Sequence, residues 1–170
     1  GKHLSDYASE ALWKPFNAEQ TAYWHIDRAM GTELGYCCFN SNARDFARFG
    51  KMNNNIGNWD GVQLIDSSFY DVAATPGAVP YYGMGFWMTD KYDTQVYYHR
   101  GLLGQYIISI PEYDLVIVRL GRSRGPASDD KHTQLFHTLI KDAIKTYGIE
   151  YPQDSTLNTP RSEINTNEII

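Results

Sequence analysis

The stretch Tyr98-His99-Arg100-Gly101-Leu102-Leu103-Gly104-Gln105 decides the fold assignment. It lies between two strand-like runs, residues 93–98 and 105–110. Its two glycines would let another backbone or a ligand approach very closely at this place. The imidazole of His99, just before them, is well placed to handle a proton or contact an anion. Taken alone, the stretch also fits an ordinary glycine-containing hairpin with a surface histidine.

Working outward, four strand candidates follow one another closely: residues 83–89, 95–98, 105–110 and 115–120. The segment Pro111-Glu112-Tyr113-Asp114 predicts a tight turn between the last two. Because short connections join antiparallel neighbours, we expect an antiparallel sheet.

Helices are predicted before and after these strands, from apolar residues at helical spacing and from residues that cap or stop a helix. They are residues 4–13, capped by Ser5 and stopped by Pro15; a helix from Ser41 or Asn42 through Phe49; a short helix capped by Asp66; and residues 129–147, capped by Ser128 and ended by Gly148. A turn-rich loop is expected at residues 53–58. The last helix should lie on one face of the sheet. The fold class is therefore α+β, an antiparallel sheet with flanking helices.

A chain of 170 residues with 42% hydrophobic and 21% charged residues is typical of one globular domain with a real core. We expect this domain to cover residues 1–151, with a loop-rich excursion carrying short helices at residues 17–81. Residues 152–170 are polar and without periodicity, which predicts a mobile tail.

Composition also excludes several classes of function. The net charge of −5 and the lack of a basic stripe argue against a nucleic-acid partner. No apolar run is long enough to span a membrane. The first residues show no signal-peptide core, and the compartment stays undetermined. The two cysteines, Cys37 and Cys38, are adjacent and are expected not to bridge, so no disulfide framework is predicted.

No metal site or cofactor is expected. His132 and His137 are five residues apart, a spacing that does not place them on one face of a helix. His3 and His25 have no acidic or cysteine partner at metal-ligand spacing. No glycine loop of the phosphate-binding type occurs.

Two serines match nucleophile motifs. Residues 121–125 spell G-x-S-x-G around Ser123, and Ser128 with Lys131 spells S-x-x-K. In a nucleophile elbow the helix begins at the serine. Here Pro126 and the expected cap at Ser128 place the start of the helix several residues after Ser123. Asp129 and Asp130, expected to point to solvent, would deny Lys131 the burial that activates such a pair. We therefore expect a polar loop and a helix cap.

The order of four segments is more specific than any one of them. These segments are residues 41–50 (S-N-A-R-D-F-A-R-F-G), 82–87 (Y-G-M-G-F-W), 99–105 (H-R-G-L-L-G-Q) and 110–118 (I-P-E-Y-D-L-V-I-V). Over roughly residues 1–147, the chain resembles the C-terminal half of the serine β-lactamase-like hydrolases. This family includes class C β-lactamases, D-Ala-D-Ala carboxypeptidases, related esterases and 6-aminohexanoate-dimer hydrolases, and its members are often periplasmic or secreted.

The resemblance implies part of a β-lactamase/transpeptidase-like fold and a set of site residues. His99 stands where the family has the first residue of K-T-G or H-x-G, and the N–H of Leu102 would be one of two oxyanion-hole donors. The implied catalytic residues are His99, Gly101 and Leu102, and the implied substrate-binding residues are Arg100, Gly104, Arg122 and Trp24. The family's serine–lysine pair and Y-x-[NS] tyrosine precede these segments. Tyr7-Ala8-Ser9 spells Y-x-S, but Tyr7 is read as packing.

The chain is therefore expected to be the C-terminal portion of a longer serine hydrolase that acts on a small amide or ester, and to be inactive alone. H-x-G in place of K-T-G favours an esterase, amidase or D-amino-acid peptidase over a true β-lactamase. A non-catalytic ligand- or peptide-binding module of the same fold is the alternative. Nothing in the sequence fixes the oligomeric state.

Overall fold

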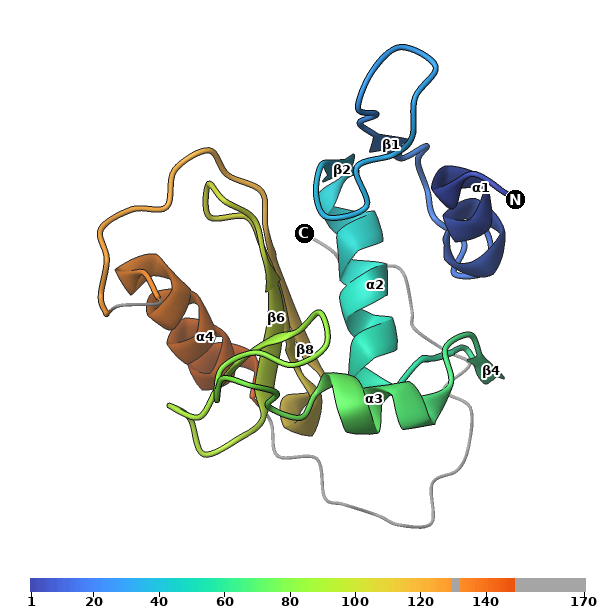
Figure 1. Cartoon of the computed structure of the whole chain (residues 1–170). Coiled ribbons are helices and arrows are strands. Elements are labelled where there is room, and N and C mark those ends of the chain that lie inside the picture. The colour runs from blue at the N-terminus through green and yellow to red at the C-terminus, as the bar shows by residue number, and fades with distance from the viewer. Residues whose placement is uncertain (130–131, 149–170) are drawn as a thin grey trace.

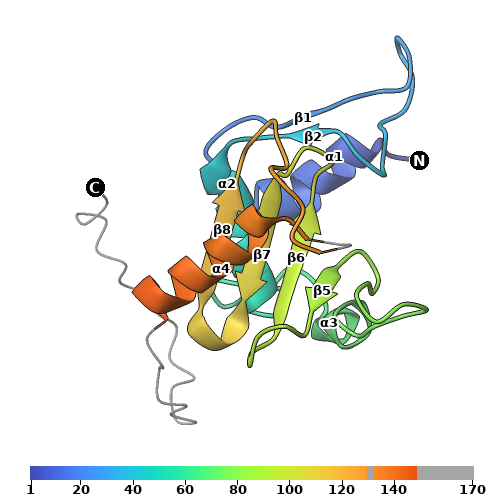
Figure 2. The ribbon, with the colours of Figure 1, turned by 90° about the vertical axis from the view of Figure 1, so that its left-hand side faces the viewer.

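A four-stranded antiparallel sheet forms the centre of the structure, in the order β5-β6-β7-β8 (Figures 1 and 2). The computed structural model describes residues 1–129 and 132–148. Its helices are α1 (Leu4–Ala8), α2 (Ala43–Asn54), α3 (Ser67–Ala73) and α4 (Gln134–Tyr147), with a π-helical turn at Ser9–Trp13 and a 3-10 turn at Pro111–Tyr113. Its strands are β1 (Tyr23–Trp24), β2 (Phe39–Asn40), β3 (Asn58–Trp59), β4 (Val62–Gln63), β5 (Trp87–Thr89), β6 (Val96–Arg100), β7 (Tyr106–Ile110) and β8 (Leu115–Arg119).

The predicted sheet is confirmed, with two corrections. Every pair in it is antiparallel, as between Tyr98 and Ile108 or Ile107 and Val118. The first strand begins at Trp87 and not at residue 83, because residues 83–86 bond to their surroundings as a loop: the Met84 N–H donates to the Ala73 carbonyl. β6, the strand of His99, also lies inside the sheet and not at its edge. Its pairing with β5 ends at Tyr98, so the last residues of β6 extend beyond β5.

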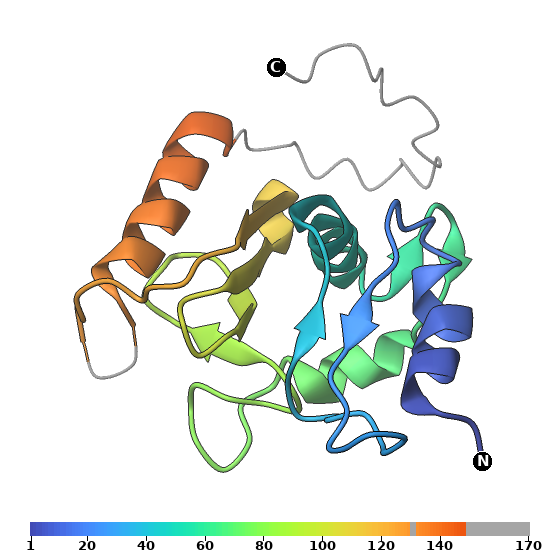
Figure 3. The ribbon, with the colours of Figure 1, turned by 90° about the horizontal axis from the view of Figure 1, so that it is seen from above.

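Two helices cover the two faces of this sheet (Figures 2 and 3). Side chains alternate between the faces along each strand. On one face Tyr98, Ile108 and Ile110 form a buried core with Phe136 and Ile140 of α4, which confirms the predicted position of the last helix. The other face carries α2.

Contact between α2 and the sheet depends on Gly50. A Cβ at this position would lie 2.4 Å from Val116 Cγ1, and the Gly50 carbonyl accepts a hydrogen bond from the Ser109 hydroxyl. A side chain at this position of α2 would therefore force the helix away from β7 and β8.

The helix starts were predicted in part. Asn42 caps α2 by accepting from the Asp45 N–H, and Asp66 caps α3 by accepting from the Ser68 N–H, as expected. Ser5 does not cap α1, because His3 occupies the N-cap position and Ser5 lies inside the helix. Its backbone N–H and its hydroxyl donate to Glu33 instead.

The expected cap at Ser128 is also wrong, because α4 begins at Gln134. Thr133 caps it by accepting from the Phe136 N–H. Asp129 does not point to solvent as predicted, since it is bonded to His132, His137 and Lys91. The predicted end of this helix at Gly148 is confirmed, since α4 ends at Tyr147 and Gly148 is its C-cap.

Two further expectations need correction. α2 continues through Asn53 and Asn54, which were predicted from the sequence to lie in a loop. The side-chain amides of both residues make hydrogen bonds to the sheet, and the Asn54 amide donates to the Leu115 carbonyl. Cys37 and Cys38, expected not to bridge, form a disulfide between adjacent residues. The predicted tail at residues 152–170 lies outside the described residues.

Candidate active site

The end of β6 and the turn into β7 hold most of the predicted site residues. The Gly101 N–H donates to the Gln105 carbonyl and the Gly104 N–H to the Gly101 carbonyl, which closes a tight hairpin. Leu102 is highly exposed at its tip. In the described part of the chain, the Leu102 N–H makes no hydrogen bond. This donor is therefore free to bind a ligand.

His99 lies on the α2 face, in a partly buried position between two aromatic rings. Its ring centroid is 5.3 Å from that of Phe49 and 4.9 Å from that of Phe86. Burial in this apolar setting lowers the pKa of His99 to about 4, against a hydrogen bond to the Gly85 backbone that raises it. His99 is therefore neutral at pH 7.

A chain of hydrogen bonds fixes the tautomer of this ring. The Tyr70 hydroxyl donates to Asn53 Oδ1 over 3.0 Å, which leaves the Asn53 amide N–H to donate to His99 Nε2 over 3.2 Å. The other ring nitrogen then carries the proton, and a hydrogen bond between the ring and the Gly85 backbone raises the pKa of His99. With both nitrogens engaged, the geometry suits His99 for holding the end of β6 in place, and a proton relay through it stays a prediction.

Sequence reasoning missed Asn53 and Tyr70. The α2 motif contained the signal, since Phe46, Phe49, Gly50 and Asn53 repeat at the helical spacing i, i+3, i+4 and i+7. Extending that period past Gly50 would have placed Asn53 on the face that meets the sheet.

Arg100 projects from the opposite face of β6, as strand alternation requires. Its guanidinium carbon lies 4.1 Å from the centroid of the Trp87 ring, within the range of a cation–π contact. The structure therefore separates Arg100 from His99 by the thickness of the sheet, and its substrate-binding role stays a prediction.

Local packing explains why two positions of the hairpin are glycine. A Cβ on Gly101 would lie 2.3 Å from Gln105 Oε1. Gly104 is buried at a φ of +83°, where a Cβ would lie 3.0 Å from the Ser123 carbonyl oxygen. The hairpin tip therefore packs on the loop after β8.

This packing brings Arg122 beside the hairpin. Arg119 donates to the Gly104 carbonyl, and the Gln105 amide donates to the Gly121 carbonyl. Arg122, the next residue, is exposed. The structure thus brings the hairpin after β6, which contains Leu102, against the segment after β8, which contains Arg122.

Trp24 lies elsewhere. It lines a groove of about 590 Å³ together with Trp13, Phe39 and residues 17–22, and none of residues 98–105 lines this groove. Its indole N–H donates to the carbonyls of Leu34 and Cys37.

The serine motifs are confirmed in part: the polar loop at Ser123 is as predicted, whereas Ser128 does not cap a helix. Ser123 lies exposed in a polar loop, and its hydroxyl accepts from the Gly125 N–H over 3.4 Å. Ser128 is exposed as well. The S-x-x-K lysine, Lys131, lies outside the described residues.

A family model described as Beta-lactamase matches residues 2–140, which is most of the chain. Among solved structures, the chain is similar to a protein of Bacillus anthracis provisionally named a 6-aminohexanoate-dimer hydrolase, with a TM-score of 0.68 and 24% sequence identity. The similarity covers 84% of this chain and 37% of the other, so the chain spans little more than a third of that structure. At this identity the likeness shows the fold, and it confirms the α+β assignment. A search of curated proteins gave no match.

Proposed function

The chain belongs to the β-lactamase family, and from this premise we propose that it supplies the substrate-side strand of a serine hydrolase that works through an acyl-enzyme. The N–H of exposed Leu102, which makes no hydrogen bond in residues 1–129 and 132–148, carries this proposal. A fixed backbone N–H stabilises the oxyanion that forms when a serine attacks an ester or amide carbonyl. Leu102 provides one such donor.

The nucleophile and its base come from a segment beyond these 170 residues. An acyl-transfer serine needs a general base within hydrogen-bonding reach. Ser123 is exposed in a loop with the Gly125 N–H on its hydroxyl, so it lacks this arrangement. A serine–lysine pair from elsewhere in the protein would face the end of β6.

The residues around the hairpin suggest the substrate class. Neutral His99 stands in place of a charged lysine, so the site itself offers less attraction to an anion at that position. Exposed Arg122 can hold a substrate carboxylate, because the guanidinium presents its donors as a planar fork. The neutral His99 favours small esters, amides or D-amino-acid peptides over β-lactams, and Arg122 favours those among them that carry a carboxylate.

A second candidate is a non-catalytic binding module of the same fold. The groove lined by Trp13, Trp24 and Phe39 favours it, since aromatic side chains provide contact area for a ligand without any catalytic group. The coding sequence upstream decides between the two. An in-frame S-x-x-K followed by Y-x-[NS] supports the hydrolase, and absence of both supports the binding module.

A turnover panel tests the hydrolase. The gene product with its upstream sequence should hydrolyse p-nitrophenyl acetate and a D-alanyl amide faster than the cephalosporin nitrocefin. The matched control is the same product with the upstream serine replaced by alanine. Preferential turnover of nitrocefin would contradict the substrate class, and turnover that survives the serine replacement would contradict the mechanism.

A further inference from the structure

Asp129, His132 and His137 converge on the α4 face of the sheet, opposite the face that carries His99. Each offers one ligand atom, and these atoms all lie within 4.8 Å of one another. Asp129 Oδ1 lies 3.2 Å from His132 Nδ1, and Asp129 Oδ2 lies 3.2 Å from His137 Nε2. We propose that this cluster binds one divalent transition-metal ion, of which Zn²⁺ is the best fit.

His132 and His137 do not share a helix, contrary to the expectation from their spacing, because α4 begins at Gln134, after the Thr133 cap. His132 lies in the segment before α4, and His137 lies in its first turns. The ring of His132 can therefore face that of His137, at a centroid distance of 5.3 Å.

Two tyrosine hydroxyls contact the histidine nitrogens that face away from Asp129, which leaves the other two nitrogens available for an ion. The Tyr98 hydroxyl is 2.7 Å from His132 Nε2, and the Tyr92 hydroxyl is 2.7 Å from His137 Nδ1. With an ion bound, each tyrosine oxygen can accept the ring N–H on its side, so the deprotonated nitrogen of each histidine would face the ion beside Asp129. Metal-binding histidines are oriented in this way by an acceptor on the far nitrogen. Two imidazoles and a carboxylate are ligands that Zn²⁺ takes in three-residue sites.

A cation already neutralises this cluster. The Lys91 ammonium is paired with Asp129 Oδ2, and the lysine side chain is about half exposed, at 47%. A metal ion would displace it into solvent. The pairing of the Asp129 carboxylate with an ammonium group supports a cation site here, and Lys91 would compete with a metal ion for Asp129.

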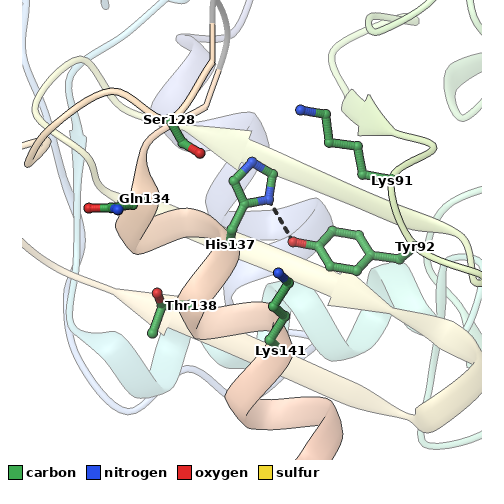
Figure 4. Close-up of a pocket in the computed structure, with 7 residues that line it drawn as sticks. All are labelled: Lys91, Tyr92, Ser128, Gln134, His137, Thr138 and Lys141. Atoms are coloured by element: carbon green, nitrogen blue, oxygen red, sulfur yellow. Dashed lines mark hydrogen bonds between the residues drawn. The ribbon is translucent and has the colours of Figure 1, made fainter.

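The fourth coordination position would open to a pocket. A hollow of about 370 Å³ adjoins His137 and is lined by Lys91, Tyr92, Lys141 and polar side chains (Figure 4). Figure 4 shows His137 pointing at Tyr92, with Lys91 and Lys141 on either side. A metal-bound water or a small anion fits this position, since the two lysines add positive charge around it.

Zinc titration by calorimetry of the metal-free 170-residue chain tests the site. The expected result is one Zn²⁺ per chain. Both Asp129→Asn and His137→Ala should weaken binding by at least about tenfold. His25→Ala removes an exposed histidine outside the cluster and should leave binding unchanged. Circular dichroism of each variant separates loss of ligands from loss of fold.

Lys91→Met makes the test sharper, because it removes the competing ammonium and keeps the length of the side chain. It should tighten Zn²⁺ binding several-fold, and Co²⁺ loaded in place of Zn²⁺ should give the visible absorption of a tetrahedral site. The proposal is overturned if folded wild-type chain shows no stoichiometric site, if both ligand variants bind as wild type does, or if Lys91→Met binds no more tightly. None of these outcomes depends on hydrolase activity.

Discussion

At the scale of single residues, buried polar side chains hold the site in place. Asp45 is fully buried and accepts from the backbone N–H groups of Glu19 and Gln20, the amide of Asn42 and the guanidinium of Arg48. Burial by itself would raise the pKa of Asp45, but these donors outweigh it and hold the pKa below its usual value. The N-A-R-D-F-A-R motif therefore ties the segment before β1 to α2.

Replacing Asp45 with Asn should destabilise the chain by about 2–4 kcal/mol, because an amide cannot accept all four donors and leaves Arg48 without its buried partner. Urea unfolding measures the loss. Asp66→Asn is the matched control and should change stability little, since Asp66 is exposed and asparagine caps a helix equally well. An equal loss in both variants would contradict the account of Asp45.

The depressed pKa of His99 makes stability depend on pH. The unfolded chain takes up a proton near pH 6.5 and the folded chain only near pH 4, so folding weakens as the pH falls through this window. The loss from His99 between pH 7 and pH 5 should be about 1–2 kcal/mol.

Comparison with His99→Gln isolates this contribution, because every other titrating group is shared. Unfolding is measured at both pH values with EDTA present. The variant should lose less stability on acidification than the wild type. Equal losses would show that the folded-state pKa of His99 is not depressed.

At the scale of elements, the contact of α2 with β7 and β8 sets the distance between helix and sheet. Gly50→Ala should destabilise the chain by about 1–3 kcal/mol, although alanine favours a helix by about 1 kcal/mol, because the new methyl group collides with Val116. The double variant Gly50→Ala, Val116→Ala relieves the collision. Thermal unfolding of both single variants and the double variant should show a favourable coupling, and strict additivity would rule the collision out.

Local sequence signals predict most of the secondary-structure elements. Short apolar runs, tight turns and the caps Asn42 and Asp66 are local signals, and the sheet, α2 and α3 were predicted from them. The start of α4 was missed because Ser128 and Thr133 are both acceptable caps, and only the packing of Phe136 against Tyr98 selects the later one. The convergence of Asp129 with His137 and of Asn53 with His99 depends on tertiary contacts that no local pattern records.

At the scale of the whole molecule, the chain belongs to the β-lactamase family, and 84% of it aligns with 37% of a structure named as a hydrolase. No helix in residues 1–129 and 132–148 combines the length and apolar character needed to cross a membrane. The hairpin tip and the loop after β8 pack on each other, which gives the proposed substrate side a common support.

Arg122→Ala in the longer gene product should weaken turnover of acidic esters more than of neutral esters, by about 1–3 kcal/mol in kcat/KM. The reason is the loss of a charge-assisted hydrogen bond to the substrate carboxylate. Arg124→Ala, in the same exposed loop, serves as the control. Equal effects on acidic and neutral esters would remove Arg122 from substrate recognition.

The central claim is that this chain supplies the oxyanion side of an acyl-transfer site whose nucleophile lies outside it. Labelling with a fluorophosphonate probe, followed by mass mapping of the modified residue, tests this most directly. The account predicts no labelling of the folded 170-residue chain and labelling of the longer gene product at an upstream serine. Stoichiometric labelling of Ser123 or Ser128 in the 170-residue chain would contradict it.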